Sequence, residues 1–372
     1  MASSTFLTLP FRTTETREVL WSGRIIQNGV TFRALPVETK MIAGHSANEQ
    51  IIFEITALES ADLDSSKLYL PKKKWFIIFR AYSITATLMP CMAVLIYGLF
   101  HHVLFQRLPV SWHYFAIRSI LALIGAVLLQ LAINVLNDVE DHLRLIDLPD
   151  QNGGSGALQG GWISARTLYR IGIGCFVFAA LCGLPAFVAE TKTLLIPLVA
   201  AAIGVLGYSG KPFGLKYRSM GDLAVFLLCG PLLTLAYSVA SFGTFDAGVI
   251  WLGLVLGFAA IVILHANNLQ DIPTDTKRGA YTLASLLGFS KAKYAVIVFY
   301  AATLVSLIGF GWKTHSYFAI ATSLLATPLM LKLSRKTVQA SGPHSPLLNQ
   351  TRVEAAQIHL ALGVLLSLGL FF

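Results

Sequence analysis

Long apolar runs separated by short polar segments constrain this chain more than any other feature of its sequence. Nine runs beyond residue 75 come close to the roughly 20 residues that cross a bilayer as a helix. They span about 77–99, 114–136, 167–189, 193–209, 222–243, 248–267, 293–311, 316–333 and 355–372. The runs are continuous, whereas the strands of a membrane barrel alternate between apolar and polar residues. The sequence therefore predicts an all-α integral membrane protein with nine transmembrane helices.

Composition supports this prediction, because 55% of the residues are hydrophobic and only 13% are charged. An ordinary soluble domain has roughly 25% charged residues. Pro185, Pro231 and Pro328 lie inside three of the runs. Membrane helices tolerate proline when their neighbours satisfy the freed backbone groups, so we expect kinks and not breaks at these positions.

The first 70 residues differ in kind from residues 71–372, which form the predicted membrane domain. The extension is rich in Ser and Thr, with short alternating stretches such as "VTFRALPV" and "IIFEITAL" and no apolar signal core. Organellar transit peptides are poor in acidic residues, and Glu15, Glu18 and Glu38 argue against one here. We therefore expect a disordered or weakly structured extension.

Basic residues indicate how the chain is oriented in the membrane. Beyond the extension, only Arg107, Arg118, Lys192 and Lys313 fall on one side of the predicted bundle, and the remaining Lys and Arg residues fall on the other. Cytoplasmic loops carry the excess of Lys and Arg in membrane proteins. The N-terminus is thus predicted to be cytoplasmic, in a bacterial cytoplasmic membrane or alternatively in a plastid membrane with the N-terminus stromal.

Acidic residues of the membrane domain cluster at the ends of two predicted helices on the cytoplasmic side. Asn134, Asp138 and Asp141 are spaced i, i+4 and i+7, which places them on one helical face. A second set repeats this pattern, with Asn267, Asn268, Asp271 and Asp275 followed by Lys277 and Arg278. Carboxylates one turn apart repel each other unless a cation lies between them, and carboxylate and amide oxygens suit Mg²⁺. A solvated rim of acids paired with neighbouring Lys and Arg is the alternative.

The segments "NVLNDVEDHLRLID" (134–147) and "LHANNLQDIPTDTKRGAYTLASLLG" (264–288) resemble the two Asp-rich motifs of the UbiA superfamily of membrane prenyltransferases. The second segment and "GYSGKPFGLKYRSMGDLAVFLLCGPL" (207–232) are most similar to the MenA-like branch, the dihydroxynaphthoate prenyltransferases of menaquinone biosynthesis. The likeness covers about residues 75–372. It implies a UbiA-like bundle with a central cavity open to the cytoplasmic side.

The resemblance also implies a function, namely Mg²⁺-dependent transfer of a prenyl group from a prenyl diphosphate to an aromatic acceptor, with dihydroxynaphthoate favoured. The expected catalytic residues are Asp138, Asp141, Asp271 and Asp275, and the expected metal ligands are these four with Asn134. The expected substrate-binding residues are Asn134, Asn137, Asn267, Asn268, Tyr208, Lys211, Lys216, Lys277, Arg278 and Arg80. Arg80 is expected to bind a carboxylate on the acceptor, although an interfacial arginine that extends to the headgroups is an alternative.

Other functions stay open at this point. A UbiA-type enzyme with hydroxybenzoate, homogentisate or haem as acceptor would have much the same motifs. A transporter is a further alternative from another class, but its polar groups would be expected near the midplane at broken helices. The glycine-rich segment 152–161 follows no predicted strand, so a nucleotide-binding loop is not indicated, and no nucleic acid partner is expected. The sequence indicates no oligomeric state.

Overall fold

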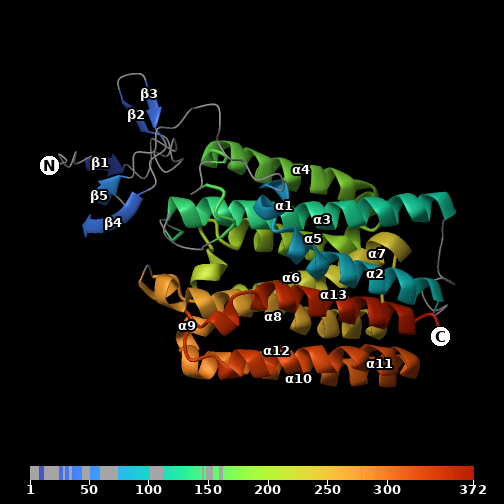
Figure 1. Cartoon of the computed structure of the whole chain (residues 1–372). Coiled ribbons are helices and arrows are strands. Elements are labelled where there is room, and N and C mark those ends of the chain that lie inside the picture. Colours follow the sequence, from blue (N-terminus) through green and yellow to red (C-terminus); the bar gives the residue numbers. More distant parts are fainter. Residues whose placement is uncertain are drawn as a thin grey trace. The chain divides into compact units, whose positions relative to one another are not determined.

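The described part of the chain is mainly helical and divides into two units, each of which is treated by itself below (Figure 1). In this computed structural model the described residues are 74–100, 112–144, 146–147, 154–158, 162–277 and 279–372, together with the backbone of five strands between residues 8 and 58. The smaller unit comprises residues 1–81 and 134–173, and the larger comprises residues 82–133 and 174–372.

Five short strands lie within the N-terminal extension. They are β1 (Thr8–Phe11), β2 (Ile25–Gln27), β3 (Val30–Phe32), β4 (Pro36–Ala43) and β5 (Ile51–Leu58). An antiparallel sheet has the order β1-β5-β4, with Phe11 opposite Ile51, and β2 pairs with β3 as a separate antiparallel hairpin. The alternating stretches noted in the sequence fall on β3, β4 and β5, because alternation suits a strand.

Helices make up the rest of the described chain. They are α1 (Lys74–Ile78), α2 (Thr85–Phe100), α3 (Trp112–Leu143), α4 (Ala165–Ala189), α5 (Thr191–Gly207), α6 (Gly221–Cys229), α7 (Pro231–Phe242), α8 (Ala247–Lys277), α9 (Leu283–Leu287), α10 (Phe289–Thr314), α11 (Tyr317–Ser323), α12 (Thr327–Gln339) and α13 (Thr351–Gly369). Short 3-10 helices lie at Ala81–Ile84, Leu215–Tyr217, Leu324–Ala326 and Pro346–Leu348.

Seven spans in the described residues are long and apolar enough to cross a membrane. They are Ala81–Phe100, Trp112–Leu143, Ala165–Ala189, Gly221–Phe242, Ala247–Thr276, Phe289–Thr314 and Tyr317–Gln339. The prediction of a helical membrane protein is thus confirmed. The other two expected spans correspond to α5, with 17 residues, and α13, with 19 residues, and neither belongs to these seven.

Three predicted spans are interrupted where a single helix was expected. The first breaks after Ile78, because Arg80 has a positive φ of 49°, which no helical residue adopts. Gly230 (φ −125°, ψ −116°) separates α6 from α7, and a 3-10 helix precedes Pro328 near the start of α12. The expectation of a kink without a break is therefore wrong at Pro231, whereas near Pro328 Ser323, Leu324, Ala326 and Thr327 keep right-handed helical angles, and Pro185 lies inside the continuous helix α4.

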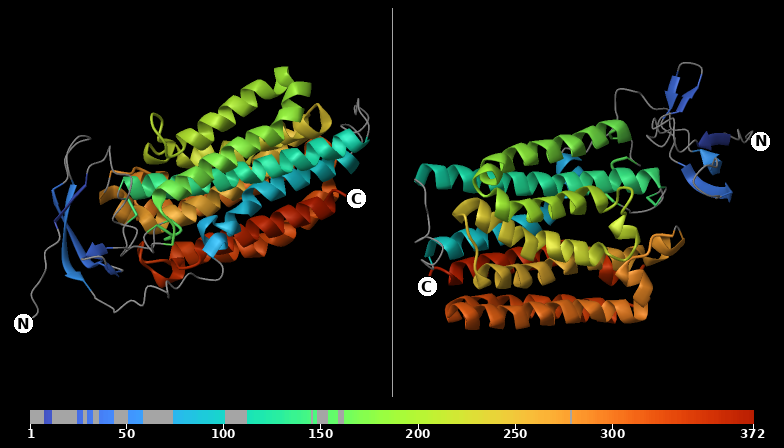
Figure 2. Two further views of the ribbon diagram at one scale, coloured as in Figure 1. Left: turned by 90° about the horizontal axis from the view of Figure 1, so that it is seen from above. Right: turned by 180° about the vertical axis from the view of Figure 1, so that it is seen from behind.

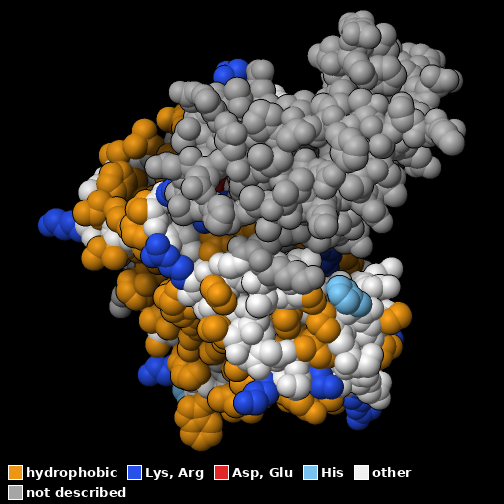
Figure 3. All heavy atoms as spheres, turned by 90° about the vertical axis from the view of Figure 1, so that its left-hand side faces the viewer, with side chains coloured by type: hydrophobic (Ala, Val, Ile, Leu, Met, Phe, Trp, Pro, Cys, Tyr) orange, Lys and Arg blue, Asp and Glu red, His pale blue; other side chains and the backbone are white. Residues whose placement is uncertain are grey.

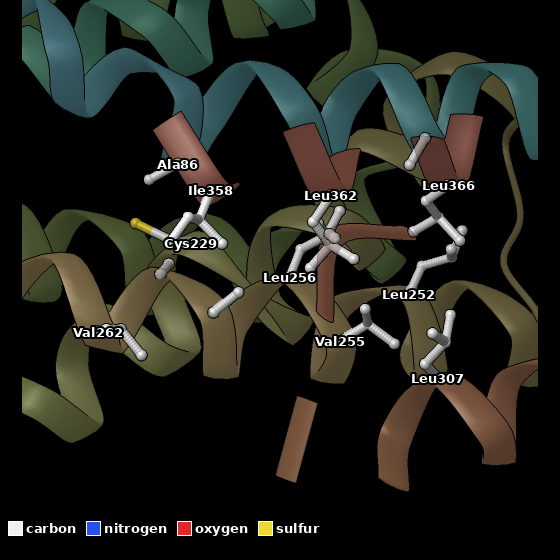
Figure 4. Close-up of a cluster of buried hydrophobic side chains, with 14 of the residues drawn as sticks. Ala86, Cys229, Leu252, Val255, Leu256, Val262, Leu307, Ile358, Leu362 and Leu366 are labelled. Carbon is white, nitrogen blue, oxygen red and sulfur yellow. The ribbon is translucent and has the colours of Figure 1, made fainter. Parts of the chain in front are cut away.

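Helix α8 is the centre of the larger unit. It packs against α2, α6, α7, α9, α10 and α13. The helices of this unit run roughly along one direction in every view (Figures 1 and 2). Close up, Leu252 and Leu256 of α8 lie between Leu362 of α13 and Leu307 of α10 (Figure 4), and all four are completely buried. The N-terminal half of α8 is therefore held by apolar contacts with both α10 and α13.

Close backbone approach fixes α8 against the junction of α6 and α7. A Cβ atom at Gly253 would lie 2.6 Å from Cα of Pro231, and one at Gly257 would lie 2.9 Å from the carbonyl oxygen of Phe226. A Cβ atom at Gly230 would in turn lie 2.6 Å from the carbonyl oxygen of Gly253. Small residues four apart allow membrane helices to touch through their backbones, which is the contact seen here.

The smaller unit has a core of its own. Ile78 of α1, Val135 and Val139 of α3, and Leu168 of α4 are buried in one cluster with Ala157, Leu158 and Ala165. Trp162 is partly buried against this cluster. The apolar face of the last turns of α3 therefore packs against this cluster, while the Asn and Asp residues of the same turns lie on a different face of the helix.

The close contact between α8 and the α6–α7 junction predicts the effect of adding a single methyl group. Gly253→Ala should destabilise the protein by about 1–3 kcal/mol, because the new Cβ meets backbone atoms that cannot rotate away. Gly174→Ala in α4 is the control, since a Cβ there meets no atom within 4 Å. Thermal unfolding in detergent measures both variants, and equal midpoints would contradict this packing.

Candidate active site

The first polar cluster lies on the last turns of α3, in the smaller unit. Asn134, Asn137, Asp138 and Asp141 are all buried there. The amide Nδ2 of Asn137 donates a hydrogen bond to Oδ2 of Asp141 (2.9 Å), and Nδ2 of Asn134 donates to the carbonyl oxygen of Phe79 (3.0 Å). Asn134, Asp138 and Asp141 all lie within α3, so they share one helical face as their spacing predicts. The amides of Asn134 and Asn137 are each held in one orientation by these hydrogen bonds.

Arg80 is part of this cluster. Its guanidinium makes an ion pair with Oδ1 of Asp138, and the Arg80 side chain is only 19% exposed. The break between α1 and the following 3-10 helix brings Arg80 to this position, because the positive φ ends the helix there. Arg80 was expected to bind an acceptor carboxylate, and in this structure its partner is a carboxylate of the protein itself.

Part of the glycine-rich segment folds over the same acids. The backbone N–H of Ser155 donates to Oδ2 of Asp138 at 3.1 Å. A Cβ atom at Gly154, where φ is +56°, would lie 2.5 Å from Oδ2 of Asp147 and 2.9 Å from Oδ1 of Asp138. Asp147 is buried too. Glycine at 154 therefore leaves open a small space lined by carboxylate oxygens.

The second polar cluster lies at the C-terminal end of α8, in the larger unit. Asn268 and Asp275 are buried, and Asn267 and Asp271 are partly buried. Nδ2 of Asn267 donates to Oδ2 of Asp271 at 2.5 Å. The same contact, an Asn amide to the carboxylate one turn later, occurs in the α3 cluster between Asn137 and Asp141. Each cluster thus combines carboxylate and amide oxygens on one helical turn.

The loop between α5 and α6 lies next to the segment that follows α8. The backbone N–H of Ser219 donates to the carbonyl oxygen of Tyr281 (2.6 Å). The backbone N–H of Tyr281 in turn donates to the carbonyl oxygen of Tyr217 (3.3 Å). This loop carries three of the predicted residues. Tyr208 is buried, Lys211 is exposed and Lys216 is partly exposed. The side chain of Lys277, the last residue of α8, and the whole of Arg278 lie outside the described residues.

Sequence reasoning missed three residues near the α8 cluster. Nη1 of Arg352, at the start of α13, donates to Oδ1 of Asn267 at 3.0 Å. Asp222 and His265 are both buried, and Oδ1 of Asp222 lies 3.4 Å from Nδ1 of His265. Nε2 of His265 donates a hydrogen bond to the carbonyl oxygen of Ala292 (2.9 Å). Arg352 is 85 residues from Asn267, and no spacing signal connects them.

The donor set of the two clusters fits a hard divalent cation. Among the described residues, no three His, Cys, Asp or Glu side chains converge as a metal site made of protein alone would require. Mg²⁺ is commonly bound by one or two carboxylates, with phosphate and water completing its shell. Oδ1 of Asn137 is buried and has no hydrogen-bond partner among the residues that the structure describes, so an oxygen ligand remains available beside Asp141.

The Arg80–Asp138 contact predicts a measurable coupling between the two side chains. Arg80→Gln and Asp138→Asn should each destabilise the protein, and the double variant should fall short of their sum by about 1–3 kcal/mol, because each single change leaves a largely buried charge. Unfolding in mixed micelles gives the four free energies.

The control pair for this cycle is Arg144 and Glu140, whose charged groups lie 3.6 Å apart on the same helix end and are more exposed. Its coupling should be no more than about 0.5 kcal/mol. Additive effects at Arg80 and Asp138 would mean that Arg80 is held by something other than this ion pair.

Comparison with known proteins points to one family. Residues 94–346 match the model of the UbiA prenyltransferase family. The 1,4-dihydroxy-2-naphthoate octaprenyltransferase of Escherichia coli is 29% identical over 270 residues, which are 68% of this chain and 86% of that protein. UbiA prenyltransferase domain-containing protein 1 of Homo sapiens is 24% identical over 315 residues, which are 81% of this chain and 86% of that protein.

Solved structures agree on the fold. A UbiA homologue from Archaeoglobus fulgidus bound to DMAPP and Mg²⁺ superposes with a TM-score of 0.51 at 16% identity, covering 80% of this chain and 99% of that one. The resemblance seen in the two Asp-rich segments is confirmed. The family model matches more than half of the chain, so this multi-pass membrane protein belongs to the UbiA prenyltransferase family.

Proposed function

We propose that this prenyltransferase uses Mg²⁺, held by carboxylates of the α3 cluster and of the α8 cluster, to bind a prenyl diphosphate, and transfers the prenyl group to dihydroxynaphthoate. The observation that carries the proposal is the repeated Asn-to-Asp contact, Asn137 with Asp141 and Asn267 with Asp271, at the ends of two membrane helices. A family homologue of known structure is described as bound to DMAPP and Mg²⁺, which supports the same ligands here.

The acceptor assignment draws on relatives. The proteins from Escherichia coli and Mycobacterium leprae, 29% identical to this chain, are named 1,4-dihydroxy-2-naphthoate octaprenyltransferases. This acceptor bears a carboxylate, and Arg80 is the basic group that we assign to a substrate anion. Its ion pair with Asp138 keeps the guanidinium at the α3 cluster. Bidentate Arg–carboxylate contacts fix orientation, which this reaction requires.

The reaction breaks the C–O bond of the prenyl diphosphate and forms a C–C bond to the ring. The bond's electron pair leaves with the diphosphate, and the ring supplies the electrons for the new bond. The ring regains aromaticity when the attacked carbon loses its proton or, where it bears the carboxylate, loses that group as CO₂, and the electrons of the broken bond return to the ring. Bound Mg²⁺ would neutralise the charge of the departing diphosphate. Asn134, Asp138, Asp141, Asp271 and Asp275 are the proposed metal ligands.

Lys211, Lys216, Lys277 and Arg278 are proposed to contact the diphosphate oxygens, together with Asn267 and Asn268. Fixed positive charges in a site poor in water stabilise charge that develops in the transition state. The hydrogen bonds between Ser219 and Tyr281 support this assignment, because they join the loop of Lys211 and Lys216 to the segment after α8. Arg352 joins this set, because it already donates to Asn267.

We further propose nine membrane spans around a cavity open to the cytoplasmic side. Helices α5 and α13 would be about 26 and 28 Å long, close to the roughly 30 Å thickness of the hydrocarbon core. The end of the larger unit where α8 ends carries most of its basic residues, several of which are visible in Figure 3. They are Lys211, Lys216, Arg218, Lys291, Lys293, Lys332, Arg335, Lys336 and Arg352.

Prenyl transfer in isolated membranes tests the metal and the acids. Asp271→Asn should lower the rate about 100-fold or more, since it removes a charge that acts in the transition state, and a chelator should abolish transfer until Mg²⁺ is restored. Asp246→Asn is the matched control at the opposite end of α8, where Asp246 accepts from the hydroxyl of Tyr97. Prenyl transfer that persists both in the presence of the chelator and in the Asp271→Asn variant would contradict the proposal.

The same membranes, incubated with a panel of aromatic acceptors and labelled prenyl diphosphates, test the acceptor separately. We expect prenylated naphthoquinol product from dihydroxynaphthoate. Product from hydroxybenzoate, homogentisate or haem alone would refute the acceptor assignment while leaving Mg²⁺-dependent prenyl transfer in place.

Orientation is tested by labelling single cysteines with a membrane-impermeant maleimide in right-side-out vesicles. Lys291 and Lys313 are both exposed and lie at opposite ends of α10. Cysteine at position 313 should react in intact vesicles, and cysteine at 291 only after permeabilisation, because basic ends stay cytoplasmic. The chain without an added cysteine is treated in parallel, which measures the labelling of its own four cysteines. The reverse pattern would place the N-terminus outside.

A further inference from the structure

A groove of about 360 Å³ runs between α10 and α12, and none of its lining residues belongs to either polar cluster. One face of α10, including Ile297, Ala301 and Leu304, forms one wall, and Met330 and Leu331 of α12 form the other. The α10 positions are spaced by three or four residues, as are Thr327, Met330, Ser334 and Val338 on α12, so each helix presents a continuous stripe to the groove. The walls are apolar along most of their length.

The groove is open to the surface within the membrane-spanning part of the chain. Its two helices belong to the candidate spans Phe289–Thr314 and Tyr317–Gln339. Ile297 is 44% exposed and Leu331 is 51% exposed, so an apolar chain from the bilayer can enter without any side chain moving. The part of α12 that lines the groove, residues 327–339, is about 18 Å long.

One end of the groove is positively charged. Arg335 lines it near the C-terminus of α12 and has no ion pair with any described residue. Its neighbour Lys336 is neutralised by Glu354, with Nζ and Oε1 2.6 Å apart. Lys293 donates to the carbonyl oxygens of Val338 (2.7 Å) and Ala340 (3.3 Å), which closes this end of α12 with a second cation. The charge of Arg335 therefore remains available to an anion.

A tyrosine with a buried hydroxyl lines the groove one helical turn from that charge. Tyr300 is only 4% exposed, and its Oη has no hydrogen-bond partner among the described residues. Buried polar groups without a partner are rare and costly. The hydroxyl has less than 1 Å² of accessible surface, so it lies behind the groove wall and out of reach of a bound lipid. Because α10 and α12 are antiparallel, as the Lys293 contacts show, Tyr300 lies nearer the membrane interior than the mouth of the groove.

From these contacts we propose that the groove between α10 and α12 binds an anionic phospholipid, with its phosphate at Arg335 and an acyl chain along Leu304, Met330 and Leu331. None of the described residues that line the groove is acidic, so it offers no carboxylate for a Mg²⁺–diphosphate. The prenyl donor is therefore not the occupant.

Native mass spectrometry of the detergent-purified full chain, mixed with phosphatidylglycerol or phosphatidylcholine, tests the proposal. The unchanged protein should retain phosphatidylglycerol in preference to phosphatidylcholine. Arg335→Gln should lower phosphatidylglycerol retention about tenfold, because it removes a charge-assisted hydrogen bond, and should leave phosphatidylcholine unchanged. Lys313→Gln, at the other end of the unit, controls for the loss of one positive charge.

Two further variants separate the groove from lipid that merely surrounds the protein. Ala301→Trp fills the groove and should remove retained lipid, whereas Val298→Trp, on the 62% exposed lipid face of the same helix, should not. Leu304→Trp fills the groove at a second position and should also remove retained lipid, which keeps the test valid if Ala301→Trp does not fold. Equal retention by all variants would overturn the proposal, as would displacement of the lipid by a prenyl diphosphate.

Discussion

The cost of placing carboxylates at the ends of apolar helices is the constraint on which the proposed chemistry depends. An acidic side chain at the centre of a membrane helix costs roughly 2.5–3.5 kcal/mol on insertion scales. Asp138, Asp141 and Asp275 are nevertheless buried at helix ends. Hydrogen bonds from Asn137 and Ser155 and the ion pair with Arg80 offset part of this cost in the α3 cluster. A bound cation would offset more, which gives the acids a reason to lie there.

The larger unit supports its cluster through packing on α8. Helix α8 touches six other helices, and the glycines at 253 and 257 bring its backbone against the α6–α7 junction. Contacts of this kind leave little freedom for the helix to rotate or slide, because packed interiors resist small displacements. Asp271 and Asp275 therefore extend from one of the most constrained helices of the unit, which suits residues that must hold a metal in a fixed geometry.

Hydropathy and spacing predicted the helical membrane fold and the two polar faces, because both are periodic features of local sequence. The i, i+4 spacing of Asn137 and Asp141 and of Asn267 and Asp271 appears in the structure as two similar hydrogen bonds. The break at Arg80 was missed, since a positive φ in a residue other than glycine depends on tertiary contacts, here the ion pair with Asp138. Arg352 was missed for the same reason, because its contact with Asn267 joins two helices that are distant in sequence.

The central claim is that acids of the α3 cluster and acids of the α8 cluster hold the Mg²⁺ that binds a prenyl diphosphate, and calorimetry with an unreactive prenyl thiolodiphosphate tests it most directly. The account predicts binding that requires Mg²⁺, with affinity lowered at least about tenfold by either Asp138→Asn or Asp271→Asn, since each removes a charge that holds the metal. Full affinity after either substitution, or binding that does not need Mg²⁺, would contradict the account.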